Sequence, residues 1–318
     1  MGRRKATGRP INGWLVIDKA PDITSTQVVN EVKRLTQAQK VGHGGTLDPL
    51  ATGVLPIAMG EATKTVAYVM DERKGYEFTL RFGEARDTDD AVGAVTETSD
   101  LRPTDEEIRA ALPSFIGLIQ QVPPQYAAVK VQGERAYDIA RRGETVELAP
   151  REIRVDGLEL TGRPDRDRAE FRMTCGKGAY VRAIARDLGQ ALGCHAHVAA
   201  LRRTEVGGFN VGNAVSLSAL ARIVEDDTLP QVLVPMTTAL AGIPALAVTE
   251  PQALRLRAGQ PVRVAPAFLG EVAATEQPAA TVRAMRAGEL IALARLEGIE
   301  LSPVRVFQAG PMPIGNRG

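Results

Sequence analysis

The sequence predicts an α+β protein in which a larger domain of strands and helices precedes a smaller domain of short strands. Strand-like stretches with apolar alternation, at 76–82 and 169–175, are interspersed with stretches of helical periodicity over residues 11–240. From residue 245 the pattern changes to short apolar strands separated by turns. We therefore expect a first domain at residues 11–240 and a second at 245–310.

The composition fits a protein with a substantial core and no membrane span. Of 318 residues, 44% are hydrophobic and 24% charged, and no apolar run is long enough to cross a bilayer. Residues 1–10 are basic but are followed by no secretory signal, so we expect a disordered basic arm. Cys175 and Cys194 form no CxxC pair, which is typical of a reducing compartment. We expect a cytoplasmic protein.

Two helices are predicted on either side of a glycine-rich segment. Thr24 and Gln27 have the spacing of a capping box, and the apolar residues after them share one face of a helix that ends near Thr36. Residues 61–70 are expected to form a second helix, which carries Lys64.

The segment between these helices is the most constrained in the chain. Gly44 and Gly45 tolerate backbone angles that other residues resist, and Asp48 precedes Pro49, which favours an extended backbone. One interpretation is that Asp48 caps a helix that begins at Pro49. The other is that its carboxylate is displayed at the floor of a cleft. The local pattern alone favours the cap.

Two polar clusters are candidate metal sites. An EF-hand loop beginning at Asp87 would need glycine and glutamate where the chain has Val92 and Thr98, so calcium is excluded, whereas magnesium stays open and an acidic turn is preferred. Cys194, His195 and His197 are too close together to surround one zinc ion. We therefore expect no metal.

A second informative segment joins a strand to a helix. The strand at 169–175 is followed by the turn Gly176, Lys177, Gly178 and by a helix whose first turn holds Tyr180 and Arg182. A cation at the positive end of a helix is unfavourable unless an anion faces it. Asp48 and a phosphate group are both candidates.

The charge distribution adds one further indication. The net charge is only +1, but residues 172–203 contain six basic side chains and one acid. Such a local excess is typical of a surface that contacts a phosphate backbone. A solvated charged helix would look the same, so the composition leaves both interpretations open.

Four stretches in this order resemble the TruB-type pseudouridine synthases, a family that acts on the T-arm of tRNA. They are GGTLDPLATGVL (44–55), QVPPQYAAVKVQG (121–133), CGKGAYVRAIARDLG (175–189) and AHVAALRRTEVGGF (196–209). The chain departs from the family pattern at Ala127, where a serine hydroxyl is lost, and at Gly176 and Ala179.

The resemblance implies roles for individual residues. Asp48 would be the catalytic carboxylate, and Arg182 would pair with it and orient it. Tyr76, a core aromatic by pattern alone, would stack on the target base and handle its proton. Tyr180 would pack beside Asp48, and Leu201 would line the uracil pocket.

Further residues are expected to contact the substrate. His43, at the tip of the glycine-rich loop, would fill the space left by a base flipped out of the tRNA. Basic side chains would contact phosphate groups. These are Lys19, Lys64, Lys130, Arg202 and Arg203.

The resemblance also implies the fold and the reaction. We expect a large mixed, mostly antiparallel sheet flanked by helices, followed by a small PUA-like β-barrel. The reaction would isomerise the uridine at position 55 in the T-loop of tRNA, without a cofactor, in a monomer that needs no protein partner. Three alternatives compete with this interpretation: a non-catalytic tRNA-binding or folding protein, a glycoside hydrolase with paired carboxylates, and a guide-RNA-dependent relative.

Overall fold

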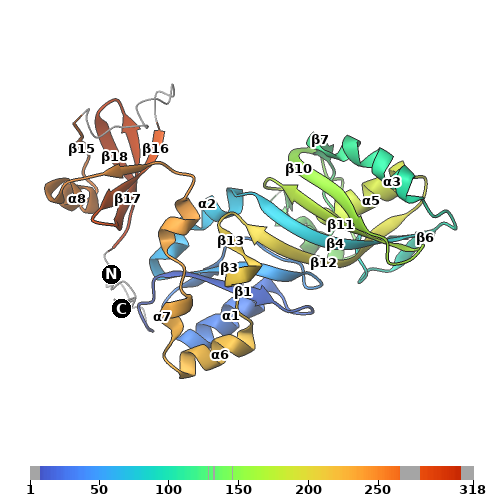
Figure 1. The fold of residues 1–318 in the computed structure, drawn as a ribbon, viewed down its shortest axis with the longest axis horizontal. Helices are drawn as coiled ribbons and strands as arrows, with labels where there is room; N and C mark the ends of the chain where they lie inside the picture. Colours follow the sequence, from blue (N-terminus) through green and yellow to red (C-terminus); the bar gives the residue numbers. More distant parts are fainter. Residues whose placement is uncertain (1–7, 128, 132, 145, 266–279, 309–318) are drawn as a thin grey trace.

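Two separate sheets divide the molecule, as the computed structural model shows (Figure 1). The structure describes residues 8–265, except 128, 132 and 145, and residues 280–308. A nine-stranded sheet is built from the first part of the chain, and a five-stranded sheet from the last. Among the residues described, no helix is both long and apolar enough to cross a membrane.

The large sheet is mixed and mostly antiparallel, as expected. Its main path runs β1-β3-β12-β4-β11-β10-β7, with β2 paired to β3 and β13 to β12. The pairing of β12 with β3 is parallel, and all the others are antiparallel. The strands are β1 (Gly13–Lys19), β2 (Val41–His43), β3 (Thr52–Met59), β4 (Lys74–Phe82), β7 (Gly117–Gln121), β10 (Arg151–Gly162), β11 (Arg168–Cys175), β12 (Ala196–Val206) and β13 (Phe209–Asn210).

Helices pack against this sheet and bury its apolar rows. The predicted helix after Thr24 is confirmed as α1 (Ser25–Thr36), and its capping box with Gln27 is formed. The predicted helix at 61–70 is instead a 3₁₀ helix (Gly60–Thr65) followed by α2 (Val66–Asp71). Further helices of this part are α3 (Asp105–Ala111), α5 (Val181–Ala191), α6 (Leu217–Glu225) and α7 (Leu229–Val232).

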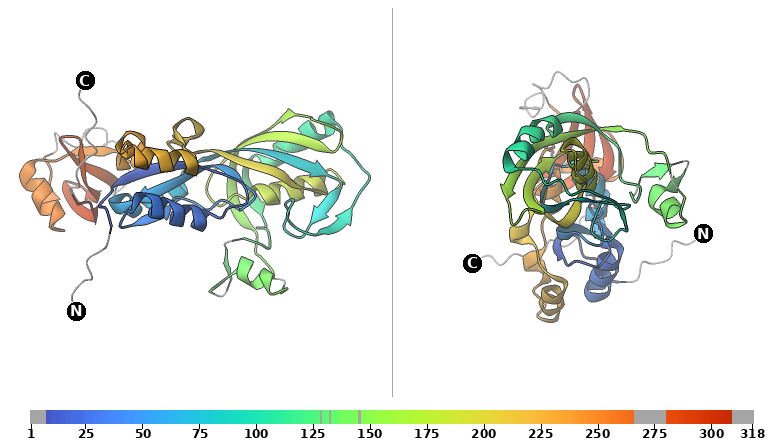
Figure 2. Two further views of the ribbon diagram at one scale, coloured as in Figure 1. Left: turned by 90° about the horizontal axis from the view of Figure 1, so that it is seen from below. Right: turned by 90° about the vertical axis from the view of Figure 1, so that its right-hand side faces the viewer.

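The segment between β7 and β10 projects from the body of the molecule (Figure 2). Pro123 and Pro124 prevent a helix directly after β7, so the chain leaves the sheet there. The projection contains a hairpin of β8 (Lys130–Val131) and β9 (Glu134–Arg135), followed by α4 (Ala136–Arg141). A small hairpin of β5 (Glu84–Arg86) and β6 (Val95–Thr98) follows β4.

The strand-rich end of the chain forms a curled sheet with its own apolar core. Its order is β14-β16-β17-β18-β15, and α8 (Glu250–Arg257) packs on it. Lys64 joins it to the first part of the chain, because its Nζ donates to Val306 O at 2.8 Å. The strands are β14 (Ala245–Ala247), β15 (Val262–Arg263), β16 (Ala280–Arg286), β17 (Glu289–Glu297) and β18 (Glu300–Val306).

The expected basic arm is only partly described. Residues 1–7 lie outside the described residues, as does most of the C-terminal tail. Residues 8–10 contradict the prediction of disorder, because the Arg9 N–H donates to Gln37 O at 2.7 Å and its carbonyl accepts from Gln39 N at 3.1 Å. These bonds fix the chain against the end of α1 before β1 begins.

The parallel contact between β3 and β12 depends on Gly53. Its φ is +96°, and a Cβ built there would lie 2.2 Å from Arg203 O. We expect Gly53→Ala to lower the free energy of unfolding by about 2–4 kcal/mol, because both the backbone angle and the strand contact are lost. Urea denaturation measures the change.

Gly42→Ala is the matched control, because a Cβ at Gly42 in β2 would meet nothing within 4 Å. We expect its free energy of unfolding to stay within about 0.5 kcal/mol of the wild-type value. Equal losses in the two variants would contradict the role assigned to Gly53.

Candidate active site

Asp48 lies in the loop between β2 and β3 and begins no helix. The residues after it form a bend, Ala51 N donates to Asp48 O at 3.1 Å, and β3 starts at Thr52. The helix-cap interpretation is therefore wrong. The carboxylate is free of a capping bond, and its side chain is 36% exposed.

Buried polar side chains fix the backbone on both sides of Asp48. Ser25 Oγ donates to Leu47 O at 3.0 Å and accepts from Leu47 N at 2.9 Å. Lys19 Nζ donates to Pro49 O at 2.9 Å. Because each neighbour of Asp48 is held from the body of the fold, the carboxylate is positioned without a regular element of its own.

Arg182 provides the charge opposite Asp48. Its Nε lies 2.9 Å from Asp48 Oδ2 and 3.8 Å from Asp90 Oδ2, and its side chain is only 4% exposed. The two terminal nitrogens donate to Thr88 O and Tyr126 O, each at 3.0 Å. The expected pairing of Arg182 with Asp48 is thus confirmed, and Asp90 is a second carboxylate beside this arginine.

The position of Arg182 in α5 explains why it needs these partners. It is the second residue of the helix, where the macrodipole disfavours a cation. Two carboxylates and two carbonyl oxygens offset that cost and the cost of burial. The guanidinium is therefore held by backbone from two other segments while its Nε edge faces Asp48.

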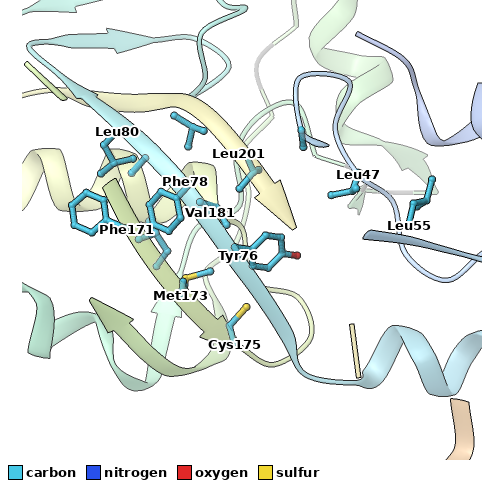
Figure 3. Packing of buried hydrophobic residues seen from close by; sticks show 14 of the residues in the cluster. Leu47, Leu55, Tyr76, Phe78, Leu80, Phe171, Met173, Cys175, Val181 and Leu201 are labelled. Carbon is cyan, nitrogen blue, oxygen red and sulfur yellow. The ribbon is translucent and has the colours of Figure 1, made fainter. Parts of the chain in front are cut away.

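Tyr76 closes one side of the site at the end of an apolar row. Phe171, Phe78 and Tyr76 follow one another across the buried face of the sheet, and the Tyr76 hydroxyl points away from the two phenylalanines (Figure 3). Tyr76 is 8% exposed, as is Leu201 on the neighbouring strand β12. Burial raises the pKa of Tyr76, and the adjacent Arg203 acts against that rise.

These side chains surround a cavity of about 250 Å³ with an apolar wall and a charged floor. Asp48, Tyr76, Tyr180, Arg182 and Leu201, all predicted from the sequence, line it together. Burial raises the pKa of Tyr180, and the nearby Asp48 carboxylate raises it further. The other lining residues are Gly45, Thr46, Leu47, Met70, Lys74, Gly178, Ala179, Val181 and Arg203.

Arg203 is a site residue whose role the sequence analysis assigned wrongly. It was expected to contact phosphate, but it is 1% exposed and donates to Val54 O at 2.8 Å, Gly45 O at 3.0 Å and Thr46 O at 3.3 Å. It stands opposite Tyr76 in the register of β12 and β4. The alternation of β12, which turns Leu201 and Arg203 to the same face, was the signal that could have revealed this.

Other predicted substrate contacts lie outside this cavity. Arg202 points to the opposite face of the sheet from Arg203 and forms a bidentate pair with Asp18, at 2.9 and 2.8 Å. Lys64 Nζ lies 2.7 Å from Glu61 Oε2 and also donates to Val306 O in the C-terminal sheet. Lys130 is in β8, but its side chain lies outside the described residues.

Two further expectations are corrected. His43 is not at a loop tip but is the last residue of β2, opposite Ile57 of β3. Lys19 is 1% exposed and donates to three carbonyl oxygens, so it is not accessible to a phosphate group. Burial lowers the pKa of Lys19 to about 8, although the Asp48 carboxylate acts in the opposite direction.

The acidic turn does not gather a metal-binding group in the described part of the chain. Asp89 pairs with Arg186 at 3.0 Å, and Asp90 faces Arg182. Across the described residues, no three His, Cys, Asp or Glu side chains are grouped as metal ligands would be. The turn instead orients arginines of α5.

The fold of this chain is shared with proteins of known structure. The chain is similar to a structure described as "Structure of H/ACA RNP bound to a substrate RNA containing 2'-deoxyuridine", with a TM-score of 0.71 and 22% identity, covering 97% of this chain and 92% of that one. It is also similar to the archaeal box H/ACA sRNP Nop10-Cbf5 complex, with a TM-score of 0.70 and 23% identity over 99% and 95% of the two chains. At these identities the likeness establishes the fold.

Sequence comparison then gives the family. Residues 33–181 match the TruB family pseudouridylate synthase N-terminal domain, and residues 182–241 match the tRNA pseudouridylate synthase B C-terminal domain. Proteins named tRNA pseudouridine synthase B from Gluconacetobacter diazotrophicus and Caulobacter vibrioides are 55% and 49% identical, over 96% and 97% of this chain and 100% and 99% of theirs. The chain belongs to the TruB family of pseudouridylate synthases, which are isomerases.

The buried position of Arg203 makes it sensitive even to a charge-conserving change. We expect Arg203→Lys to lower the free energy of unfolding by about 3 kcal/mol, because one ammonium group cannot replace three guanidinium contacts and leaves buried carbonyl oxygens unpaired. Urea denaturation of the purified variant measures this loss.

Arg202→Lys serves as the neighbouring control. The Arg202 side chain is 37% exposed, so its pair with Asp18 is screened by solvent and we expect a change below about 1 kcal/mol. If both substitutions cost the same, Arg203 does not hold the loop as described.

Proposed function

We propose that this enzyme isomerises the uridine at position 55 in the T-loop of tRNA to pseudouridine. The observation that carries the proposal is the ion pair between Asp48 and Arg182 on the floor of a cavity lined by Tyr76 and Leu201. The names of the relatives, which specify tRNA, support the choice of substrate. The unbroken GGTLDPLATGVL segment supports the assignment of the catalytic aspartate to Asp48.

The cavity suits one flat base. In this proposal the uracil ring stacks on Tyr76 and packs against Leu201, which lie on neighbouring strands. Tyr180 packs beside Asp48 at the start of α5 and orients the carboxylate. Asp48 and Arg182 are then directly below the sugar and the glycosidic bond.

The reaction exchanges one bond of the base for another. The C1′–N1 bond breaks, the base turns, a C1′–C5 bond forms, the C5 proton leaves and N1 gains a proton. Asp48 supports bond cleavage through its charge, whether it attacks C1′, adds to C6 or assists a glycal route. The Tyr76 hydroxyl relays the C5 proton. The isomerisation is redox-neutral, so these residues are proposed to act without a cofactor.

The target base can enter the cavity only after it has left the folded T-loop. We assign to His43, at the end of β2, the task of filling the vacated space, and to Lys130 and Arg202 contacts with the RNA backbone. We propose a catalytic domain at residues 11–240 and a PUA-like RNA-binding domain at 245–310. The enzyme is proposed to act in the cytoplasm as a monomer.

The decisive experiment compares wild type with Asp48→Asn on an unmodified tRNA transcript. The substitution keeps the shape of the side chain and removes its charge, so we expect conversion at position 55 to fall by at least about 1,000-fold while RNA binding is kept. Mapping of pseudouridine in the product identifies the converted position.

Asp165→Asn is the matched control, because this carboxylate is also paired with an arginine and is similarly exposed, at 39%. It should convert tRNA at the wild-type rate. Tight binding of tRNA without conversion by wild type would overturn the proposal and favour a folding factor. Conversion at another uridine would leave the reaction intact but refute the T-loop assignment.

Tyr76→Phe separates stacking from proton transfer. The ring is kept, so we expect unchanged RNA affinity but release of the C5 proton slowed by about 100-fold or more. Tritium release from [5-³H]uridine in single turnovers measures this step. An unchanged rate would show that the hydroxyl takes no part.

The pH dependence gives an independent check on Tyr76. Because its pKa is raised by burial, the hydroxyl stays protonated throughout the neutral range. The wild-type rate profile should therefore contain no step from this group below pH ~10. A step near pH 8 that is absent in Tyr76→Phe would contradict the assignment.

A further inference from the structure

The rim of the active-site cavity carries an exposed ion pair that takes no part in holding Asp48. Lys177 Nζ lies 3.1 Å from Asp71 Oδ1, and the two side chains are 68% and 63% exposed. Lys177 is in the turn between β11 and α5, and Asp71 is the last residue of α2. The pair therefore joins two segments that are distant in sequence.

Both partners adjoin residues that line the cavity. Met70 precedes Asp71, and Gly178 follows Lys177, and both Met70 and Gly178 line the space above Asp48. The charged side chains themselves are turned to solvent. They lie next to residues that line the cavity but do not line it themselves.

The fold does not need this bridge. Lys74 Nζ donates to Met70 O at 2.8 Å and to Glu72 O at 2.7 Å, so the end of α2 is held from within. An ion pair as exposed as Lys177 and Asp71 contributes little to stability, because water screens it and both side chains lose conformational freedom. The pair is thus free to exchange partners.

We propose that Lys177 binds a backbone phosphate beside the flipped nucleotide, and that Asp71 competes with this phosphate for Lys177 in the free enzyme. The inference rests on the proposed RNA substrate. When a base enters the cavity, its phosphates stay at the rim, where an ammonium group forms a charge-assisted hydrogen bond with them. Asp71 keeps Lys177 over the rim but must be displaced.

Substitutions of the two partners should therefore have opposite effects on RNA affinity. In an Asp48→Asn background, which prevents conversion, Lys177→Gln should weaken binding of a tRNA transcript about fivefold and lower the salt slope of log Kd by about one. Asp71→Asn should tighten binding about threefold, because the competing carboxylate is removed. With Asp48 present, neither change should alter the single-turnover rate at saturating enzyme.

The double variant and a distant control complete the test. Asp71→Asn should have no effect once Lys177→Gln is present, because its benefit acts through the lysine. Arg109→Gln, in α3, removes a cation that is 59% exposed and paired with Asp105, and should leave Kd unchanged.

Each other outcome overturns the inference. Weaker binding by both single variants would make the pair a structural bridge. Tighter binding by Asp71→Asn without Lys177 would reflect general repulsion of RNA. If wild type converts tRNA and Kd is unaffected by either change, this inference alone fails. If wild type binds tRNA without converting it, the proposed function fails, and the binding data still decide the role of Lys177.

Discussion

The site depends on the ion pair between Asp48 and Arg182 at the floor of a largely apolar cavity. The guanidinium Nε lies 2.9 Å from the carboxylate and fixes its position. The arginine is in turn too buried to stand without partners, and Asp90 and two carbonyl oxygens provide them. Much of the surrounding architecture, including the hairpin after β4 and the start of the projecting segment, serves to hold this guanidinium.

The basic side chains divide into buried ones that bond to the backbone and exposed ones at the surface. Lys19 and Arg203 donate hydrogen bonds to backbone carbonyl oxygens around the loop of Asp48, where a positive charge strengthens each bond. Arg202 and Lys177 remain at the surface, each already paired with a carboxylate. The local excess of positive charge seen in the sequence is therefore largely compensated in three dimensions by acids from other segments of the chain.

The sequence predicted the fold class, α1 with its cap, the strands around Tyr76 and the partners Asp48 and Arg182. These predictions were correct because capping-box spacing, two-residue alternation and an unbroken motif can each be recognised within a short stretch of sequence. Arg203 and Lys19 were misassigned because a basic side chain looks the same in sequence whether it meets phosphate or a buried carbonyl oxygen. Burial is set by strand order, and nothing local indicated that β12 lies between β3 and β4. The hydrogen bond from Lys64 to Val306 could not be predicted from local sequence either, because its two partners lie 242 residues apart.

The position of β12 in the sheet also affects how the enzyme folds. On one side of β12 lies β3 with the loop of Asp48, and on the other lie β4 with Tyr76 and the β11–α5 unit with Arg182. Until residues 196–206 have been synthesised, no strand joins the two halves of the sheet, and each half keeps an open edge with unpaired backbone groups. Catalytic competence therefore requires β12 to pair with both halves. Activity reports completed folding more faithfully than secondary-structure content does.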